Sequence, residues 1–147
     1  MREKSTSNLE STLKKAKGVS YEQLLDSTSL TGPIPLRDYL NKYISDHDLI
    51  CSQIKHDSLI PKDYVDGIFN GHRKNPSRDR VIAITRAMHM NYEETQRTLK
   101  IAQVGALYPK IPRDLAISYA IAHDYSVLEL NDFLENKGFE TLETQKK

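Results

Sequence analysis

The residues best suited to chemistry form a short basic cluster in the middle of the chain. The segment 72–80 contains only one carboxylate, that of Asp79. Its strongly basic side chains are those of Arg73, Lys74, Arg78 and Arg80. Clustered guanidinium and ammonium groups attract phosphate oxygens even in a nearly neutral protein. The formal net charge is only +1, so the pattern predicts a local phosphate-binding surface or, alternatively, a solvated turn.

Motifs of enzymes and of metal sites are missing from the sequence. It contains no Gly-rich phosphate loop and no GxSxG motif. The five histidines lack HxxxH or HExxH spacing, and Cys51 is the only cysteine, so no metal site and no internal disulfide are expected. Cys51 is close in sequence to His47 and His56, but we predict a small buried residue rather than a nucleophile. We therefore expect neither enzymatic activity nor a cofactor.

Length and composition indicate a small globular protein. The chain has 147 residues, which suffices for one well-buried domain with short extensions. No apolar stretch has the length of a membrane span, and residues 1–13 lack the apolar core of a secretory signal. These features, together with the single cysteine, predict a cytoplasmic protein that has no contact with a membrane.

The elements that must position the basic cluster are helices. Glycine and proline divide the chain, and apolar residues recur between these breaks at steps of three and four, so we predict an all-α fold. Ser52, Asn91 and Ser126 are the predicted helix caps. In the central part of the chain the predicted helices span Leu36–Asp46, about 52–58, about 61–70, from Pro76–Ser77 to Met88, and about 91–102.

Four regions follow from this division. Residues 1–32 are predicted to form a flexible tail with one or two short helices, because they are rich in Ser, Thr and Lys. Residues 33–104 contain the five central helices. Residues 105–140 add a C-terminal helical pair, which either covers the core or dimerises. Residues 141–147 are predicted to be a disordered tail.

The segment 53–77 has the sequence QIKHDSLIPKDYVDGIFNGHRKNPS. This segment ends a helix with the pattern apolar-apolar-Asn-Gly. Basic residues, Pro-Ser and then an apolar helix follow. This order resembles the lambda-repressor/Cro-like (Xre-type) helix-turn-helix family, and the resemblance covers about residues 36–102. It implies a five-helix lambda-repressor-like DNA-binding domain and regulation of transcription. Double-stranded DNA is the implied partner, and a homodimer is the expected assembly because one domain contacts few phosphates.

The resemblance also implies which side chains meet DNA. The helix of about residues 61–70 would enter the major groove, with phosphate contacts on both sides of it. Side chains facing the bases would be those of Lys62, Asp63, Asp66 and Gly67. Those facing phosphates would be Ser52, Gln53, Asn70, Arg73 and Lys74, with a further contact from Arg78.

Several positions depart from the family pattern. Lys55 occupies a position that is usually small, and Leu59 one that is usually glycine, so we expect the Lys55 stem to pass the neighbouring helix and Leu59 to reshape the turn. Asp63 and Asp66 can accept from cytosine but repel phosphates. The alternative is therefore a protein-interaction module on the same fold, such as an antitoxin, anti-repressor or signalling adaptor, with weak or no DNA binding.

The C-terminal helical pair carries apolar stripes without a recognisable motif. A dimer surface is one interpretation of these stripes, and packing within the monomer is the other. The candidate dimer residues are Tyr119, Leu130, Phe133 and Leu134.

Overall fold

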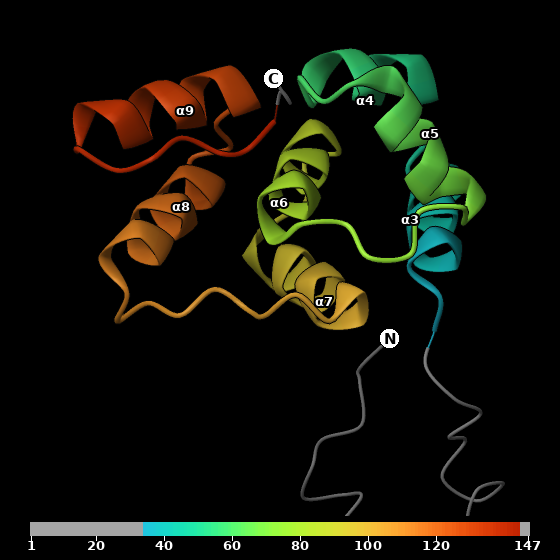
Figure 1. Cartoon of the computed structure of the whole chain (residues 1–147), viewed down its shortest axis with the longest axis horizontal. Helices are drawn as coiled ribbons and strands as arrows, with labels where there is room; N and C mark the ends of the chain where they lie inside the picture. Colours follow the sequence, from blue (N-terminus) through green and yellow to red (C-terminus); the bar gives the residue numbers. More distant parts are fainter. Residues whose placement is uncertain (1–33, 145–147) are drawn as a thin grey trace, which may run out of the picture. The chain divides into compact units, whose positions relative to one another are not determined.

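The computed structural model describes residues 34–144, and all regular secondary structure in this range is helical (Figure 1). The chain divides into two units, Met1–Pro33 and Ile34–Lys147, and the described helices belong to the second unit. The helices predicted for residues 1–32 lie outside the described residues. None of the described helices is long and apolar enough to cross a membrane.

The described helices follow the predicted periodicity closely, so the all-α prediction is confirmed. Their ends differ from the predicted ends by one or two residues, as is usual at helix termini. They are α3 (Leu36–Asp46), α4 (Cys51–Asp57), α5 (Lys62–Asn70), α6 (Arg78–Ala87), α7 (Tyr92–Ala102), α8 (Pro112–Ala122) and α9 (Val127–Asn136).

Helix α6 occupies the centre of the unit, between α4 on one side and α9 on the other (Figure 1). Every residue from Arg80 to Ala87 is buried. The buried stretch includes Arg86, which the sequence did not mark as a core residue. Arg86 donates to the carbonyls of Met90 and Tyr125 and pairs with Asp124, so its charge is compensated although burial lowers its pKa.

Local capping residues define where three of these helices begin. Asn91 and Ser126 each form a capping box with the glutamate three residues later, as predicted. Ser77 accepts a hydrogen bond from the Arg80 N–H and caps α6. The caps satisfy backbone donors that would otherwise lack partners at the helix starts.

Two predictions at the start of α4 are wrong. Cys51 is exposed rather than buried, because the inward face of this short helix is occupied by Ile54. Ser52 is not the cap, since Ile50 holds the N-cap position and makes no side-chain capping bond. Helix α4 begins at Cys51, one residue before the predicted start, so Ser52 lies inside its first turn.

The C-terminal pair packs against the central helices within the same unit. Leu130 and Leu134 are fully buried in the core, so the structure corrects their proposed place on a dimer surface. Residues 141–144 also depart from the predicted disordered tail. Leu142 is buried, and its N–H donates to Asn131 Oδ1 at 2.7 Å, because the start of the predicted tail continues along α9.

Two ion pairs join α8 to α6. Arg113 approaches Asp79 with two guanidinium nitrogens, at 3.1 and 3.3 Å. Arg78 Nη2 donates to Asp114 Oδ2 at 2.6 Å, and the same carboxylate oxygen accepts from the Tyr108 N–H at 2.9 Å. Because Asp114 is buried, this second pair is the one whose loss leaves a poorly solvated charge.

We expect Asp114→Ala to lower the free energy of unfolding by about 2–3 kcal/mol, because it leaves Arg78 without its carboxylate. The value lies below that of a fully buried pair, since 26% of the Arg78 side chain is exposed. Urea unfolding followed by far-UV circular dichroism measures the change. The matched control is Asp132→Ala on the exposed side of α9, with less than about 0.5 kcal/mol expected. Equal losses in both variants would contradict this role.

Candidate nucleic-acid interface

Helices α4 and α5 form a compact helix-turn-helix pair joined by residues 58–61. Ser58 is buried in the turn, where its hydroxyl donates to the Lys55 carbonyl and accepts from the Ile60 N–H. Leu59 has a φ of 61°. The leucine thus adopts the left-handed conformation for which glycine is favoured, at a cost of about 1–2 kcal/mol. The Leu59 side chain packs against the core. The turn accommodates leucine in the conformation that glycine would adopt and does not have to be reshaped.

An ion pair connects α4 with α5 directly. Lys55 Nζ lies 2.5 Å from Asp66 Oδ1. The Lys55 ammonium thus reaches α5, and the hydrogen bond with Asp66 raises the pKa of Lys55. Asp66 is therefore partly neutralised and is not a free acceptor for a base edge.

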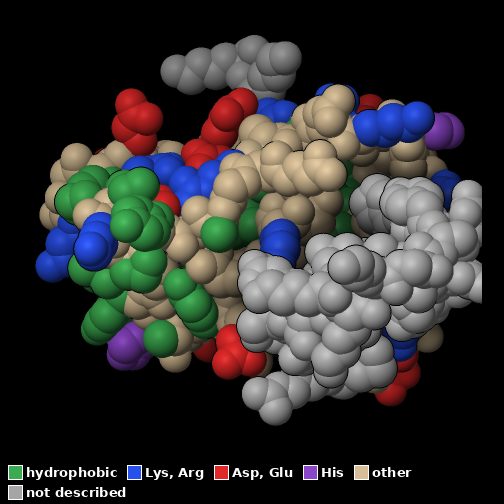
Figure 2. Space-filling model, turned by 90° about the horizontal axis from the view of Figure 1, so that it is seen from below, with side chains coloured by type: hydrophobic (Ala, Val, Ile, Leu, Met, Phe, Trp, Pro, Cys, Tyr) green, Lys and Arg blue, Asp and Glu red, His purple; other side chains and the backbone are tan. Residues whose placement is uncertain are grey.

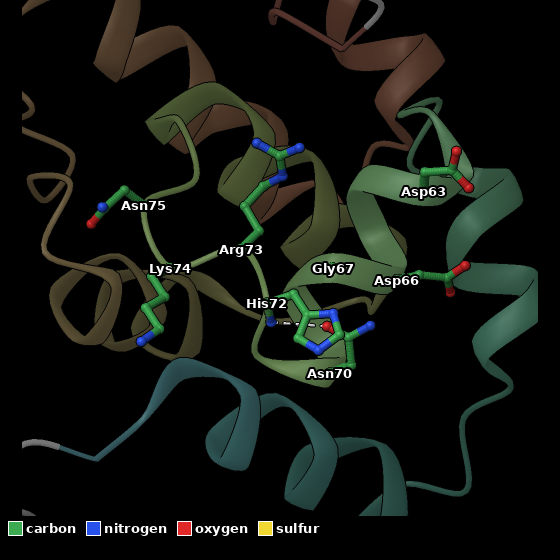
Figure 3. Close-up of a pocket in the computed structure, with 8 residues that line it drawn as sticks. All are labelled: Asp63, Asp66, Gly67, Asn70, His72, Arg73, Lys74 and Asn75. Carbon is green, nitrogen blue, oxygen red and sulfur yellow. Dashed lines mark hydrogen bonds between the residues drawn. The ribbon is translucent and has the colours of Figure 1, made fainter.

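The two faces of α5 differ sharply. Tyr64, Val65 and Ile68 are buried, and the opposite face is polar and accessible. Figure 3 shows the carboxylates of Asp63 and Asp66 pointing away from the basic residues that follow the helix. An open pocket of about 550 Å³ lies beside this face. Its lining residues are Asp63, Asp66, Gly67, Asn70, His72, Arg73, Lys74 and Asn75.

Helix α3 fixes the C-terminal end of α5. Arg37 Nη1 donates to the Asn70 carbonyl at 3.3 Å, and Asn41 Nδ2 donates to the Phe69 carbonyl at 3.0 Å. Gly71 then reverses the chain with a φ of 84°. A Cβ atom at Gly71 would lie 2.8 Å from Arg37 Cδ, but this long and exposed side chain could move, so it is the positive φ that favours glycine here. The sequence analysis missed Arg37 and Asn41, since partners 28 and 33 residues apart leave no local signal.

Tyr64 organises the basic loop that follows α5. The guanidinium groups of Arg73 and Arg80 lie 4.1 and 4.2 Å from the centre of its ring, and its hydroxyl accepts from the Ser77 N–H at 3.0 Å. Cations over an aromatic face are attracted by its quadrupole. The Tyr64 side chain therefore contacts the loop at Arg73 and Ser77 and helix α6 at Arg80, and it holds Arg73 close to α5.

Gly67 has a structural role in the same arrangement. Its carbonyl accepts from the Arg73 N–H at 2.9 Å, and a Cβ atom on Gly67 would lie 3.3 Å from Arg73 Cβ. The glycine thus lets the loop close onto α5. The close approach of Arg73 is sufficient to explain why a glycine occurs at position 67, and no contact with a base is required. Gly67 nevertheless lines the open pocket.

The four cations of segment 72–80 have separate environments. Arg73 and Lys74 are exposed. Arg78 is held by Asp114 in the ion pair with α8, so it is not free for the phosphate contact that the sequence predicted for it. Arg80 is buried, and its Nε and Nη2 atoms have no hydrogen-bond partner within the described residues.

The remaining predicted site residues lie at the surface of α4 and α5. Ser52 and Gln53 are exposed on α4, and Gln53 Nε2 donates to Asp57 Oδ1 at 2.8 Å. Lys62 and Asp63 are exposed at the start of α5, and Asn70 is exposed at its end. Asn70 Oδ1 accepts from the His72 N–H at 2.9 Å (Figure 3). The arrangement offers a polar helix face with donors on either side, and no group of three or more metal-ligating side chains occurs among residues 34–144.

Comparison of the chain with protein-family models, with curated proteins and with solved structures finds no match. Functional inference therefore depends on the geometry of the chain itself.

We expect Tyr64→Phe to lower the free energy of unfolding by about 1 kcal/mol, because the Ser77 N–H loses its acceptor. Tyr64→Leu should cost more, since it also removes the ring that contacts Arg73 and Arg80, at about 0.5–1 kcal/mol for each cation. Chemical unfolding measures both variants. Tyr39→Phe serves as control, because no hydrogen bond of the Tyr39 hydroxyl occurs in the described part of the chain, and a change within about 0.5 kcal/mol is expected. If Tyr64→Leu were no more costly than Tyr64→Phe, the stacked cations would not stabilise the loop.

Proposed function

We propose that the protein binds double-stranded DNA in a sequence-specific manner and regulates transcription, with α5 as the reading helix. One observation carries the proposal. The polar face of α5 projects from a helix-turn-helix pair, and Arg73 and Lys74 stand exposed at its end in a loop held by Tyr64. A helix in this position fits the major groove, and cations beside it fit the flanking phosphates.

The first turn of α5 supplies the groups for base recognition. Lys62 can donate to guanine O6 or N7, and Asp63 can accept from cytosine N4. Both side chains are exposed and have different hydrogen-bonding properties. Asp66 is the less effective reader, because Lys55 holds its carboxylate.

Phosphate contacts fall on both sides of the reading helix. Arg73 and Lys74 supply the charged ones, while Ser52, Gln53 and Asn70 supply neutral donors. Two cations per copy release few counterions. A homodimer that contacts two half-sites would double this contribution, which is how helix-turn-helix proteins reach useful affinity.

A second candidate function is binding of a protein partner through the same face. The observation that favours it is the presence of Asp63 and Asp66 on α5, because carboxylates weaken the attraction to a phosphate backbone. A partner with a basic surface would suit these two groups. Selection from random duplexes at low salt separates the candidates, since a protein-binding module would enrich no sequence.

For DNA binding, we expect Arg73→Ala and Lys74→Ala each to weaken binding to all duplexes and to reduce the slope of log Kobs against log salt by about 0.9. Lys62→Ala should instead relax the preference at one base pair, costing about 1–3 kcal/mol on the preferred duplex. Fluorescence anisotropy on the selected duplex, at several salt concentrations, measures both effects.

The matched control for these variants is Lys110→Ala. Lys110 is exposed but lies just before α8, outside the proposed interface. Its loss should leave the salt slope and the base preference unchanged. A selected duplex whose binding is insensitive to Arg73→Ala, Lys74→Ala and Lys62→Ala would refute the assignment of this face.

A further inference from the structure

Helix α8 differs from the other surface helices in having apolar side chains around most of its circumference. From Leu115 to Ala122 it contains no charged residue. Its inward face packs in the core through Ala116, Ile117, Ala120 and Ile121. A helix that is hydrophobic all round is normally covered all round, and one face of α8 lacks a cover within the described unit.

The uncovered face carries several exposed apolar side chains. We use the term α8 stripe for four side chains, Tyr108, Ile111, Leu115 and Tyr119, which are 54, 47, 55 and 47% exposed. The last three recur every four residues and therefore lie on one side of the helix. Hydrophobic side chains gather at the left of Figure 2, the end of the molecule at which Figure 1 places α8.

Aromatic contacts hold one end of the stripe in place. The Tyr119 ring stacks on His123 with ring centres 4.1 Å apart and on Phe133 with centres 5.2 Å apart. Tyr125 contacts both Tyr119 and Phe133 edge-on. This end of the stripe is thus preorganised, so little side-chain entropy of Tyr119 would be lost when a partner covers it.

We propose that the α8 stripe binds the α8 stripe of a second copy of this chain in an antiparallel, two-fold symmetric pair. Ile111, Leu115 and Tyr119 are evenly spaced about Leu115, which allows the surface to be self-complementary. Leu115 then lies against Leu115 of the other copy, and Ile111 lies against Tyr119. Packing of rows spaced by four residues is a common mode of helix pairing.

The exposed area agrees with the requirement for a homodimer. Four half-exposed side chains of this size present on the order of 400 Å² of apolar surface per copy. A standard interface removes about 800 Å² from each partner, and about 65% of a homodimer interface is apolar. The α8 stripe supplies most of that apolar part, and neighbouring polar residues would complete the rim.

The inference names the surface through which the proposed DNA-binding protein would dimerise, but it depends on α8 alone. Helices α8 and α5 lie at opposite ends of the view in Figure 1, so pairing through α8 leaves both reading helices uncovered. A test of self-association without DNA therefore separates failure of this inference from failure of the proposed function.

Sedimentation equilibrium of the full chain over a concentration series tests the pairing. We expect a monomer–dimer equilibrium, with a dissociation constant raised about 100-fold or more by Leu115→Glu, because both copies then bury an unpaired carboxylate. The matched control is Leu128→Glu, an exposed leucine of α9 outside the stripe, which should leave the constant unchanged. A monomer at every concentration, or a dimer insensitive to Leu115→Glu, would overturn the proposal.

Site-specific crosslinking tests the two-fold geometry. In a Cys51→Ser background, Leu115→Cys should form an oxidised dimer readily, because the symmetry axis brings the two copies of residue 115 together. Leu128→Cys in the same background should crosslink little. Both variants must retain the helical circular dichroism of the parent chain. Equal crosslinking at the two positions would exclude the antiparallel pairing.

Discussion

Burial of α6 from Arg80 to Ala87 is the constraint on which the packing of its neighbours depends. A helix that is covered on every side needs neighbours around its whole circumference, and α4, α7 and α9 pack against it. Helix α5 is held instead by α3 and α4. It can therefore turn a polar face to solvent without exposing the core.

Charged groups within a short segment have different roles because their neighbours differ. Arg78 and Arg80 are two residues apart, yet one pairs with Asp114 on α8 and the other lies over the ring of Tyr64. Arg73 contacts the same ring from the exposed side of the loop. Only cations that remain exposed can interact with a phosphate. The exposed basic surface is therefore formed by Arg73 and Lys74 and is smaller than the basic cluster in the sequence.

The described unit presents two surfaces of opposite character. Its α5 face is polar and combines carboxylates with cations, whereas its α8 stripe is apolar and free of charge. A charged surface suits solvated ligands whose binding depends on salt, and an apolar one suits a partner that excludes water. Binding through the α5 face and pairing through the α8 stripe therefore depend on different interactions, and each can be tested without the other.

The sequence by itself determined the helices of residues 34–144 and two of their capping boxes, because periodicity and capping act over three or four residues. The Asn91 and Ser126 capping boxes and the Gly71 helix end are local in this sense. It also placed Lys62, Asp63, Arg73 and Lys74 at the surface around α5. Only the tertiary structure decided that Arg78 is taken by α8, that Arg37 and Asn41 cap α5, and that Leu130 and Leu134 are core residues. Each of these outcomes depends on contacts between residues far apart in the chain. Such contacts form when the helices pack together, and local helix propensity does not encode them.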